Sequence, residues 1–407
     1  MQKKLLFEYA MLIVFVFLFG GIVAALESAN FFYDDMLVTN DEIERFSAIS
    51  MGNFLVVDDK NISLQASTNS EDIVCSNVDL NLFGFIKIKS VDVKVVNTNL
   101  IVCGNTVGVY IENNGVTVVG FGGVKTNNSI IYPFENSGIK VGDIILSIND
   151  EKISSSKDID NILSSSVYQG QELVIKYLSG EKECEEKLYP VYDEVDAVYK
   201  LGLWIRENAS GIGTLTFITE KNNKFGALGH GICENGQKTP MTASGGTLHQ
   251  CNILGINKGK KGVAGEIKAM FRADIEEEGV VIKNNECGVF GQVKDNSVLK
   301  NGVKMEVGGK LTAKPGKAYI YCQLDEDNIN KYEIEIIKTN YQSKNSQKSL
   351  VIRITDKRLL EKTGGIIQGM SGSPIVQNDK IVGAVTHVFV NDPTKGFGIY
   401  LDWMLNQ

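Results

Sequence analysis

The chain has 407 residues, of which 43% are apolar and 22% are charged, and its formal net charge at pH 7 is −8. This composition is typical of a globular protein with room for two or three domains, and the acidic balance gives no electrostatic support for nucleic-acid binding. Glycine is abundant, proline is scarce, and short β-branched runs alternate with turn residues. This pattern predicts a mostly β protein.

The first predicted element is an apolar run from about residue 10 to residue 26, which follows Lys3 and Lys4. A run of about 17 apolar residues is at the lower limit for spanning a bilayer. The lysines favour a cytoplasmic N-terminus, with the rest of the chain on the other side of the membrane. We therefore predict a membrane anchor or signal segment over residues 1–27. A cleaved signal peptide is the alternative, because residues 24–29 offer small side chains for cleavage.

A polar stretch rich in Asn, Asp and Ser comes next, and we interpret residues 28–94 as a spacer with some β structure. Residues 95–192 then alternate like paired strands, interrupted by a helix-like stretch at 156–163. Within this unit, the segment SGIKVGDIILSINDEKI over residues 137–153 resembles the signature of PDZ domains. The resemblance therefore predicts a PDZ domain over residues 95–192.

PDZ domains take a peptide C-terminus as an added strand, and loop amides hold its terminal carboxylate. The resemblance places this peptide-binding loop at Val107, Gly108, Val109 and Tyr110. Asp143 is expected to fix a turn by bonding nearby amides, which is a structural role.

From residue 193 to the end, roughly a dozen short strand candidates are separated by Gly and Asn turns, a spacing that suits paired β-barrels. The predicted architecture is an N-terminal transmembrane helix, a PDZ domain and a chymotrypsin-like double β-barrel. We assign residues 193–407 to the peptidase domain, on the evidence of the motifs below.

The segment Gly369-Met370-Ser371-Gly372-Ser373-Pro374 carries the chemistry. A serine hydroxyl attacks a carbonyl only when a base removes its proton and amide donors stabilise the oxyanion. The two glycines let the amides of Gly369 and Ser371 point the same way, as an oxyanion hole requires. This order of residues resembles the Gly-Asp-Ser-Gly-Gly-Pro loop of chymotrypsin-type peptidases, and it predicts Ser371 as the nucleophile.

The chain has three histidines, at His230, His249 and His387. His230 follows an apolar strand, is flanked by glycines and precedes Ser371, which is the order of base and nucleophile in chymotrypsin-type enzymes. We predict His230 as the general base. His249 is expected to be structural, whereas His387 lies on a strand that would line the substrate cleft and either shapes binding there or is structural.

Two aspartates are candidates for the acid that orients the histidine. Asp274 lies 44 positions after His230, and Asp356 lies 15 positions before Ser371. Sequence spacing alone does not decide between them.

Together, the PDZ-like unit and the segments LGLWIRENASGIGTLTF, GALGHGI and GMSGSP, in this order, resemble the stage IV sporulation protein B family, the S55 serine peptidases of endospore-forming bacteria. The resemblance assigns the catalytic serine, histidine and acid to Ser371, His230 and Asp356. We adopt Asp356 on that basis and keep Asp274 as the alternative.

The resemblance also implies a role and a location. Such a peptidase lies at the forespore inner membrane and faces the intermembrane space, where it cleaves itself and a membrane-bound inhibitor of an intramembrane protease. This cleavage triggers processing of the sigma-K factor precursor. The competing interpretations are a non-catalytic PDZ adaptor and a general envelope quality-control protease, in which the PDZ domain usually follows the protease.

No cofactor and no metal site are predicted, because the seven cysteines form no CxxC pair. We expect them to be small buried hydrophobic residues. A single disulfide between Cys103 and Cys184 is the alternative.

Overall fold

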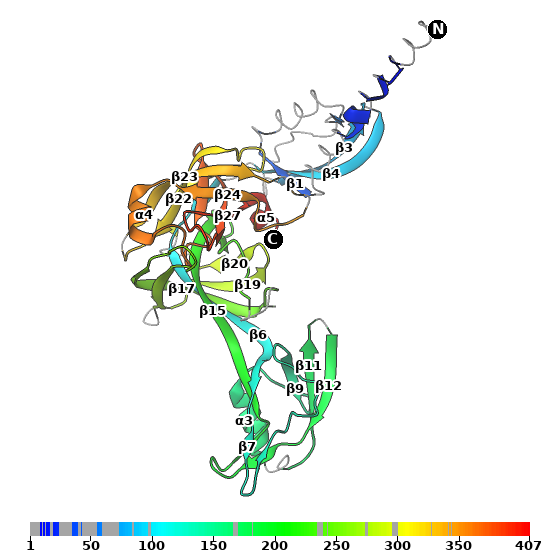
Figure 1. Ribbon diagram of the computed structural model, residues 1–407, viewed down its shortest axis with the longest axis vertical. Helices are drawn as coiled ribbons and strands as arrows, with labels where there is room; N and C mark the ends of the chain where they lie inside the picture. The colour runs from blue at the N-terminus through cyan, green and yellow to red at the C-terminus, as the bar shows by residue number, and fades with distance from the viewer. Residues whose placement is uncertain are drawn as a thin grey trace.

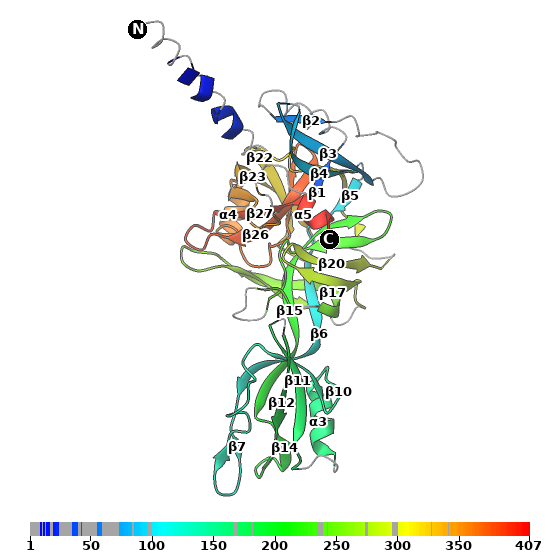
Figure 2. The same cartoon turned by 90° about the vertical axis from the view of Figure 1, so that its right-hand side faces the viewer.

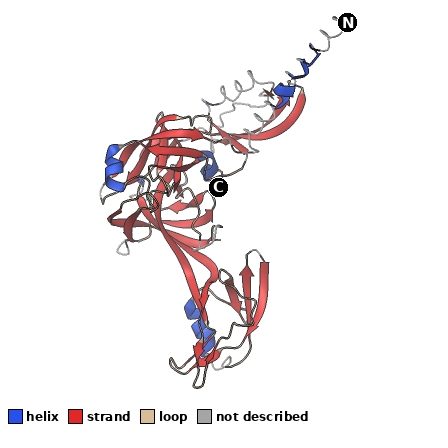
Figure 3. Ribbon diagram, in the orientation of Figure 1, coloured by secondary structure: helices blue, strands red, loops and turns tan. Residues whose placement is uncertain are grey.

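The computed structural model describes residues 9, 11–12, 14–16, 19–23, 35–39, 42, 55–58, 73–83, 85–96 and 99–407, except for 166–169, 181, 234–238, 242, 273–275, 295–299, 327, 341 and 343. Strands dominate it, as predicted for a mostly β protein (Figure 3). Among these residues, no helix is both long and apolar enough to cross a membrane. The predicted anchor at residues 1–27 falls mainly on residues outside the described ones.

The predicted spacer contains a four-stranded sheet. Its strands lie in the order β1 (Asp35–Val38), β4 (Ile86–Val96), β3 (Ile73–Leu82) and β2 (Leu55–Asp58). Only β1 and β4 are parallel. The buried side chains of this sheet join the hydrophobic cluster of the C-terminal barrel described below, so the segment is a folded layer of the protein (Figure 1).

Two long strands connect the lower and upper parts of the molecule. β6 (Thr106–Phe121) and β15 (Leu203–Thr219) pair antiparallel from the lower unit into the upper body (Figures 1 and 2). Each strand therefore contributes to two hydrophobic cores. The valines of β6 near residue 116 belong to the lower core, whereas those near residue 107 belong to the upper one.

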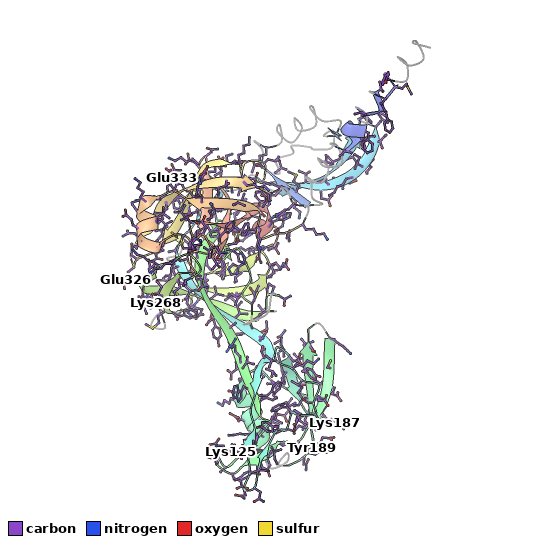
Figure 4. All side chains as sticks on the ribbon, viewed as in Figure 1. Lys125, Lys187, Tyr189, Lys268, Glu326 and Glu333 are labelled. Carbon is purple, nitrogen blue, oxygen red and sulfur yellow. The ribbon has the colours of Figure 1, made fainter. Side chains whose placement is uncertain are left out.

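The lower unit is the PDZ-like one. Its further elements are β7 (Val124–Lys125), β8 (Ile130–Ile131), β9 (Ile144–Ile148), β10 (Glu151–Lys152), α3 (Ser156–Ser164), β11 (Leu173–Ser179), β12 (Lys182–Leu188), β13 (Val191–Asp193) and β14 (Val198–Lys200). α3 begins at a capping box, in which Ser155 and Asp158 satisfy each other's backbone amides. Lys187 and Tyr189, labelled in Figure 4, both bond Glu172 and fasten the end of β12 to the start of β11.

The first barrel of the upper body closes through six strands, in the order β15, β16, β20, β19, β17 and β6. The added strands are β16 (Lys224–Ala227), β17 (Ala243–Asn257), β19 (Gly279–Asn285) and β20 (Gly288–Val293), while β18 (Glu266–Phe271) forms a hairpin with β17. β5 (Asn99–Val102) pairs with β15 and leads on to the second barrel.

The second barrel also closes through six strands, in the order β22, β23, β24, β27, β26 and β25. These are β22 (Gly316–Gln323), β23 (Ile329–Thr339), β24 (Leu350–Ile354), β25 (Pro374–Gln377), β26 (Lys380–Val388) and β27 (Lys395–Tyr400). β21 (Val303–Val307) links β26 to β5, and the short helices α4 (Lys357–Thr363) and α5 (Leu401–Leu405) complete the unit.

The predicted peptide-binding loop at Val107, Gly108, Val109 and Tyr110 is not a loop. These residues lie within β6, paired on one side with β15 and on the other with β17. Val107 and Val109 are fully buried in the core of the first barrel. Both strand edges are filled, so no peptide can add there and the prediction is wrong. These residues form a strand and not a loop because β6 continues from the first barrel into the lower unit.

The predicted boundaries at residues 95 and 193 also differ from the packing units. The first half of β6 belongs to the barrel, and Leu203 and Ile205 at the start of β15 pack on the PDZ-like core. The PDZ-like unit is thus inserted between two strands of the first barrel.

The alternative of a disulfide between Cys103 and Cys184 is not met, since neither residue takes part in a disulfide. Cys103 is buried in the first barrel, and its burial raises the pKa of the thiol. Cys251, Cys287 and Cys322 are likewise buried, as expected of small hydrophobic residues, whereas Cys184 is half-buried and Cys233 is exposed, which differs from that expectation.

Candidate active site

The loop that carries Ser371 links α4 to β25 and depends on two glycines. Gly369 and Gly372 have φ values of 95° and 94°, in the left-handed region that favours glycine. A Cβ on Gly372 would lie 2.1 Å from the carbonyl oxygen of Thr214, so the loop and β15 approach as closely as glycine permits. The glycines on either side of Met370 and Ser371 are therefore required by the backbone conformation of the loop and by its close approach to β15.

The Ser371 hydroxyl points back into the fold. Its Oγ lies 2.5 Å from the carbonyl oxygen of Leu228 and 3.1 Å from that of Thr386. No hydrogen bond joins this hydroxyl to a histidine ring in the described part of the chain. The serine is thus held between the end of β16 and strand β26.

His230 follows a tight turn at the end of β16. Leu228 and Gly229 both have left-handed backbones, with φ values of 67° and 66°. A left-handed leucine is strained, and such strain is common at functional sites. The turn directs the Leu228 carbonyl at Ser371 and brings the His230 ring to 5.1 Å from the ring of His387, centroid to centroid.

The tautomer of His230 follows from one contact. Its Nδ1 lies 2.9 Å from the carbonyl oxygen of Gly231. A carbonyl can only accept a hydrogen bond, so Nδ1 carries the proton and Nε2 keeps its lone pair. Burial lowers the pKa of His230, with the Gly231 contact acting in the opposite direction. The ring is therefore neutral at pH 7, as a base that accepts a serine proton must be.

His387 completes a pair of neighbouring rings. Its Nδ1 is buried and has no hydrogen-bond partner among the residues that the structure describes. Burial, followed by the proximity of His230 and Lys348, lowers the pKa of His387 to about 4. His249, by contrast, contacts Thr247 Oγ1 through Nε2 at 2.8 Å and stacks on Phe271, which fits its expected structural role.

Asp356 does not contact His230 in this structure. Asp356 is the N-cap of α4, and its carboxylate accepts hydrogen bonds from the backbone amide and the guanidinium of Arg358. The carboxylate also accepts from the backbone amide of Glu333 on the second barrel, which Figure 4 labels. Arg358 holds the pKa of Asp356 below its usual value. The prediction that Asp356 orients His230 is therefore not met by this geometry. The alternative, Asp274, lies outside the described residues.

The predicted oxyanion donors remain available. Among the described residues, no hydrogen bond uses the amide of Gly369 or that of Ser371, whereas Met370, Gly372 and Ser373 all donate to carbonyl groups. The two amides named in the prediction are thus left for an incoming oxygen.

Two threonines that the sequence reasoning missed hold the serine loop. Thr214 and Thr216 are fully buried on β15. Their hydroxyls donate to the carbonyl oxygens of Gly369 and Gly372, each at 2.7 Å. Their spacing of two residues places both side chains on one face of the strand, and this was the available signal.

Asn284 was also missed, and it fixes the histidine turn. Its amide group accepts from the backbone N–H of Ile232 at 2.8 Å and donates to the carbonyl oxygens of Ile232 and Met241, each at 2.9 Å. All three bonds are buried. Nothing in the sequence around residue 284 pointed to residues 232 and 241, because the contact is formed only by the closure of the barrel.

The described residues hold no group of three or more His, Cys, Asp or Glu side chains arranged to bind a metal ion. The arrangement offers instead a hydroxyl, a neutral imidazole and free amides. These are the parts needed for nucleophilic attack on a carbonyl group.

Comparison with known families agrees with this chemistry. Residues 197–405 match the family described as SpoIVB peptidase S55, which covers just over half of the chain. Residues 92–187 match the PDZ domain family.

The PDZ domain of an SdrC-like protein from Listeria monocytogenes is similar to part of the chain. It is 24% identical, with a TM-score of 0.19, and the match covers 23% of this chain and 90% of that one. A search of curated proteins found no match.

Proposed function

Because this chain belongs to the SpoIVB peptidase S55 family, and is therefore a serine peptidase that hydrolyses peptide bonds, we propose that Ser371 is its nucleophile and His230 its general base. The observation that carries the assignment is the meeting of the Ser371 hydroxyl with the turn that presents His230. The neutral state of His230 and its free Nε2 support the role of base.

The reaction follows from these groups. Nε2 of His230 takes the hydroxyl proton while Oγ of Ser371 bonds to the substrate carbonyl carbon, and the amides of Gly369 and Ser371 receive the developing oxyanion. The C–N bond then breaks as His230 returns the proton to the leaving amine. Water, activated by the same ring, cleaves the acyl-enzyme ester and restores Ser371.

The structure corresponds to a resting state in this scheme. The Ser371 hydroxyl must turn from the Leu228 carbonyl to Nε2 of His230 before attack. Until it does so, the Gly231 carbonyl performs one task of the usual acid, since it fixes the tautomer of His230. It carries no full charge, and so it stabilises the imidazolium less than a carboxylate would.

The triad also requires an acid. We propose that a carboxylate joins His230 when substrate binds, and the family resemblance favours Asp356 over Asp274. Asp356→Asn and Asp274→Asn, assayed side by side, separate them. The variant of the true partner should lose about 10⁴-fold in kcat. If both variants keep full activity, the Gly231 carbonyl suffices and the proposal of an acid fails.

We propose that the biological role is sporulation signalling. In this role the enzyme cleaves itself and a membrane-bound inhibitor of an intramembrane protease, which triggers processing of the sigma-K factor precursor. The family match over residues 197–405 and the PDZ unit support this proposal. The test incubates the purified chain with the extracytoplasmic part of such an inhibitor. Specific fragments should appear with the parent chain and not with Ser371→Ala.

A non-catalytic adaptor is the second candidate, favoured by the single observation that Ser371 bonds Leu228 and not His230. A fluorophosphonate probe distinguishes the two functions. Serine Oγ displaces fluoride from phosphorus, and the product is mapped by mass spectrometry. Labelling should fall on Ser371, disappear in His230→Ala and persist in Ser373→Ala. Absence of labelling in the parent chain would favour the adaptor.

We also propose that the protein is held at the forespore inner membrane by its N-terminal segment and faces the intermembrane space. The apolar run after Lys3 and Lys4 supports this topology. Carbonate extraction of sporulating cells should leave the chain in the membrane fraction, and deletion of residues 1–27 should release it. Equal extraction of both forms would contradict the anchor.

A further inference from the structure

The loop that joins β23 to β24 carries a short segment beside the proposed catalytic groups, and we call residues 344–349 the strap. The base of this loop is closed. The backbone amide of Asn340 donates to the carbonyl oxygen of Ser349 at 2.7 Å, and the Asn340 side chain donates to that of Lys348 at 2.8 Å. Residues 344 and 345 at the other end are exposed. Movement of the strap therefore leaves the pairing of β23 with β24 intact.

Gln347 in the strap connects the two barrels. Its carbonyl oxygen accepts a hydrogen bond from Thr386 Oγ1 on β26 of the second barrel, at 2.6 Å. Its side-chain Nε2 donates to the carbonyl oxygen of Glu286 at 2.7 Å, in the turn between β19 and β20 of the first barrel. A single residue thus crosses from one barrel to the other.

Both ends of this bridge lead to the proposed catalytic groups. Thr386 is 5% exposed, and its carbonyl oxygen lies 3.1 Å from Oγ of Ser371. Glu286 lies two residues after Asn284, which anchors the turn that follows His230. The strap therefore joins a group that holds the serine hydroxyl to the turn that supports the histidine.

Thr386 lies in an irregular part of β26. The register between β26 and β27 shifts between Val385 and Val388, and Thr386 and His387 fall within this interval. Bulges of this kind are frequent beside active sites, where they change the direction of a side chain. The position of Thr386 therefore depends on contacts outside the strand ladder, of which the bond to Gln347 is one.

Lys348 adds a second contact between the strap and the wall of the site. Its Nζ lies 5.3 Å from the centroid of the Phe397 ring on β27, within the range of a cation–π interaction. After burial and the proximity of His230, the charge of Lys348 also contributes to lowering the pKa of His387. The strap thus lies against β26 and β27 next to the two histidines.

We propose that the strap is an autoinhibitory element of the peptidase. In the closed state Gln347 holds Thr386 and Glu286 together, and the Ser371 hydroxyl stays on the Leu228 and Thr386 carbonyls. A substrate that enters between the barrels displaces the strap, and the hydroxyl then turns to Nε2 of His230. The fraction of molecules with an open strap sets the rate of reaction. This inference rests on the proposed roles of Ser371 and His230.

The test measures how fast the full chain is labelled at Ser371 by a fluorophosphonate. Gln347→Ala removes the hydrogen bond to Glu286 and should be labelled about threefold to tenfold faster than the parent, the factor that one net hydrogen bond gives. Asn345→Ala is the control, because Asn345 is exposed in the same strap and bonds neither barrel partner of Gln347 in the described part of the chain. It should be labelled at the parent rate.

A rate for Gln347→Ala equal to or below that of the parent would overturn the proposal, since misfolding slows labelling and an open strap accelerates it. Absence of labelling in every variant would overturn the proposed nucleophile, and with it the strap. Labelling of the parent and of Gln347→Ala at one rate would remove the strap alone and leave the proposed function standing.

A second variant tests the other end of the bridge. Thr386→Val removes the hydroxyl that donates to Gln347 and should also be labelled about threefold to tenfold faster. Thr355→Val is the control on the same barrel, because the Thr355 hydroxyl bonds the Glu333 carboxylate at 3.3 Å and not the strap. Slower labelling of Thr386→Val in a chain that urea unfolding shows to be stable would contradict the proposal.

Hydrogen–deuterium exchange shows whether the strap has opened. Amides of residues 344–349 should exchange tenfold or more faster in Gln347→Ala than in the parent. Those of α3 in the lower unit should exchange at the same rate in both chains. Faster exchange of the strap without faster labelling of Ser371 would show that the strap opens but does not restrain the peptidase, and it would overturn the inference.

Discussion

The hydroxyl of Ser371 donates to the carbonyl oxygen of Leu228 at 2.5 Å, and Leu228 lies two residues before His230. One strained turn therefore positions two groups that come from separate barrels. Its consequences can be measured.

Gly229→Ala should damage this turn. The left-handed φ of 66° costs an alanine about 1 kcal/mol, and the added Cβ would lie 3.1 Å from Thr386 Cγ2 and 3.2 Å from the Val385 carbonyl oxygen. We expect a loss of stability of about 1–3 kcal/mol and a larger fall in kcat than in 1/KM. Gly262→Ala is the control, with a φ of 84° and open space around the Cβ. Equal effects of the two substitutions on kcat would argue against a special role of the turn.

The pH profile of kcat/KM should report His230. Protonation removes its capacity as a base, so activity falls as pH drops through the pKa of the folded enzyme. Burial lowers this pKa, and the acid limb should therefore lie below pH 6.5, the ordinary histidine value. The measurement follows hydrolysis of a peptide substrate from pH 4.5 to 8.5. An acid limb above pH 6.5 would contradict a buried His230 as the general base.

His387 should make stability depend on pH. Its pKa is about 4 in the folded chain and about 6.5 when unfolded, so the unfolded chain binds the proton first as pH falls. Stability should decline between pH 6.5 and 4 by up to about 3 kcal/mol from this group. His387→Gln should flatten the decline in urea unfolding, and His249→Gln on β17 should leave it unchanged. An identical pH dependence in the parent and His387→Gln would show that the buried ring is not the cause.

Thr214→Val and Thr216→Val should loosen the serine loop. Each substitution removes a buried hydroxyl that donates a 2.7 Å hydrogen bond to the carbonyl of Gly369 or Gly372. The loss should lower the free energy of unfolding by about 1–3 kcal/mol. We expect lower stability in both variants and a tenfold or greater fall in kcat for Thr214→Val. Thr219→Val is the control at the last residue of β15, since the Thr219 hydroxyl accepts from the Lys224 amide at 3.0 Å and not from the serine loop. Full activity of Thr214→Val would mean that the loop holds its shape unaided.

Asn284→Asp should displace the histidine turn while preserving side-chain shape. The substitution removes both hydrogen bonds donated to Ile232 and Met241 and aims a buried carboxylate at their carbonyl oxygens. The cost should be about 3–5 kcal/mol at neutral pH. Chemical denaturation gives the folded fraction of the variant. Activity per folded molecule should fall mainly through kcat. A stability within 1 kcal/mol of the parent would indicate that Asn284 is not the anchor of the turn.

Sequence patterns predicted those features that depend on local chemistry. The glycines around Ser371, the glycine-flanked His230 and the recurrent short strands all follow from what nearby residues permit. The mostly β fold, the serine peptidase family and the PDZ unit were accordingly predicted.

The errors arose where a segment's role depends on distant partners. Residues 107–110 alternate like any strand, and only their pairing with β17 shows that they belong to a barrel. Asp356 caps the N-terminus of α4, and its spacing from Ser371 in the sequence did not indicate this role. The contacts of Thr214 and Asn284 join residues more than 40 positions apart, which no periodicity reports.

The paired strands β6 and β15 set the distance between the PDZ-like unit and the active site. A unit on one flexible linker samples many orientations, whereas two paired strands restrict the orientations open to it. Leu203, which packs on the PDZ-like core, and Thr214 beneath the serine loop are 11 residues apart, or about 36 Å of extended strand. A substrate segment held by the PDZ-like unit near Leu203 would reach Ser371 only with a bond about ten or more residues away. The length of the tail beyond the cut, as well as its sequence, would then select what is cleaved.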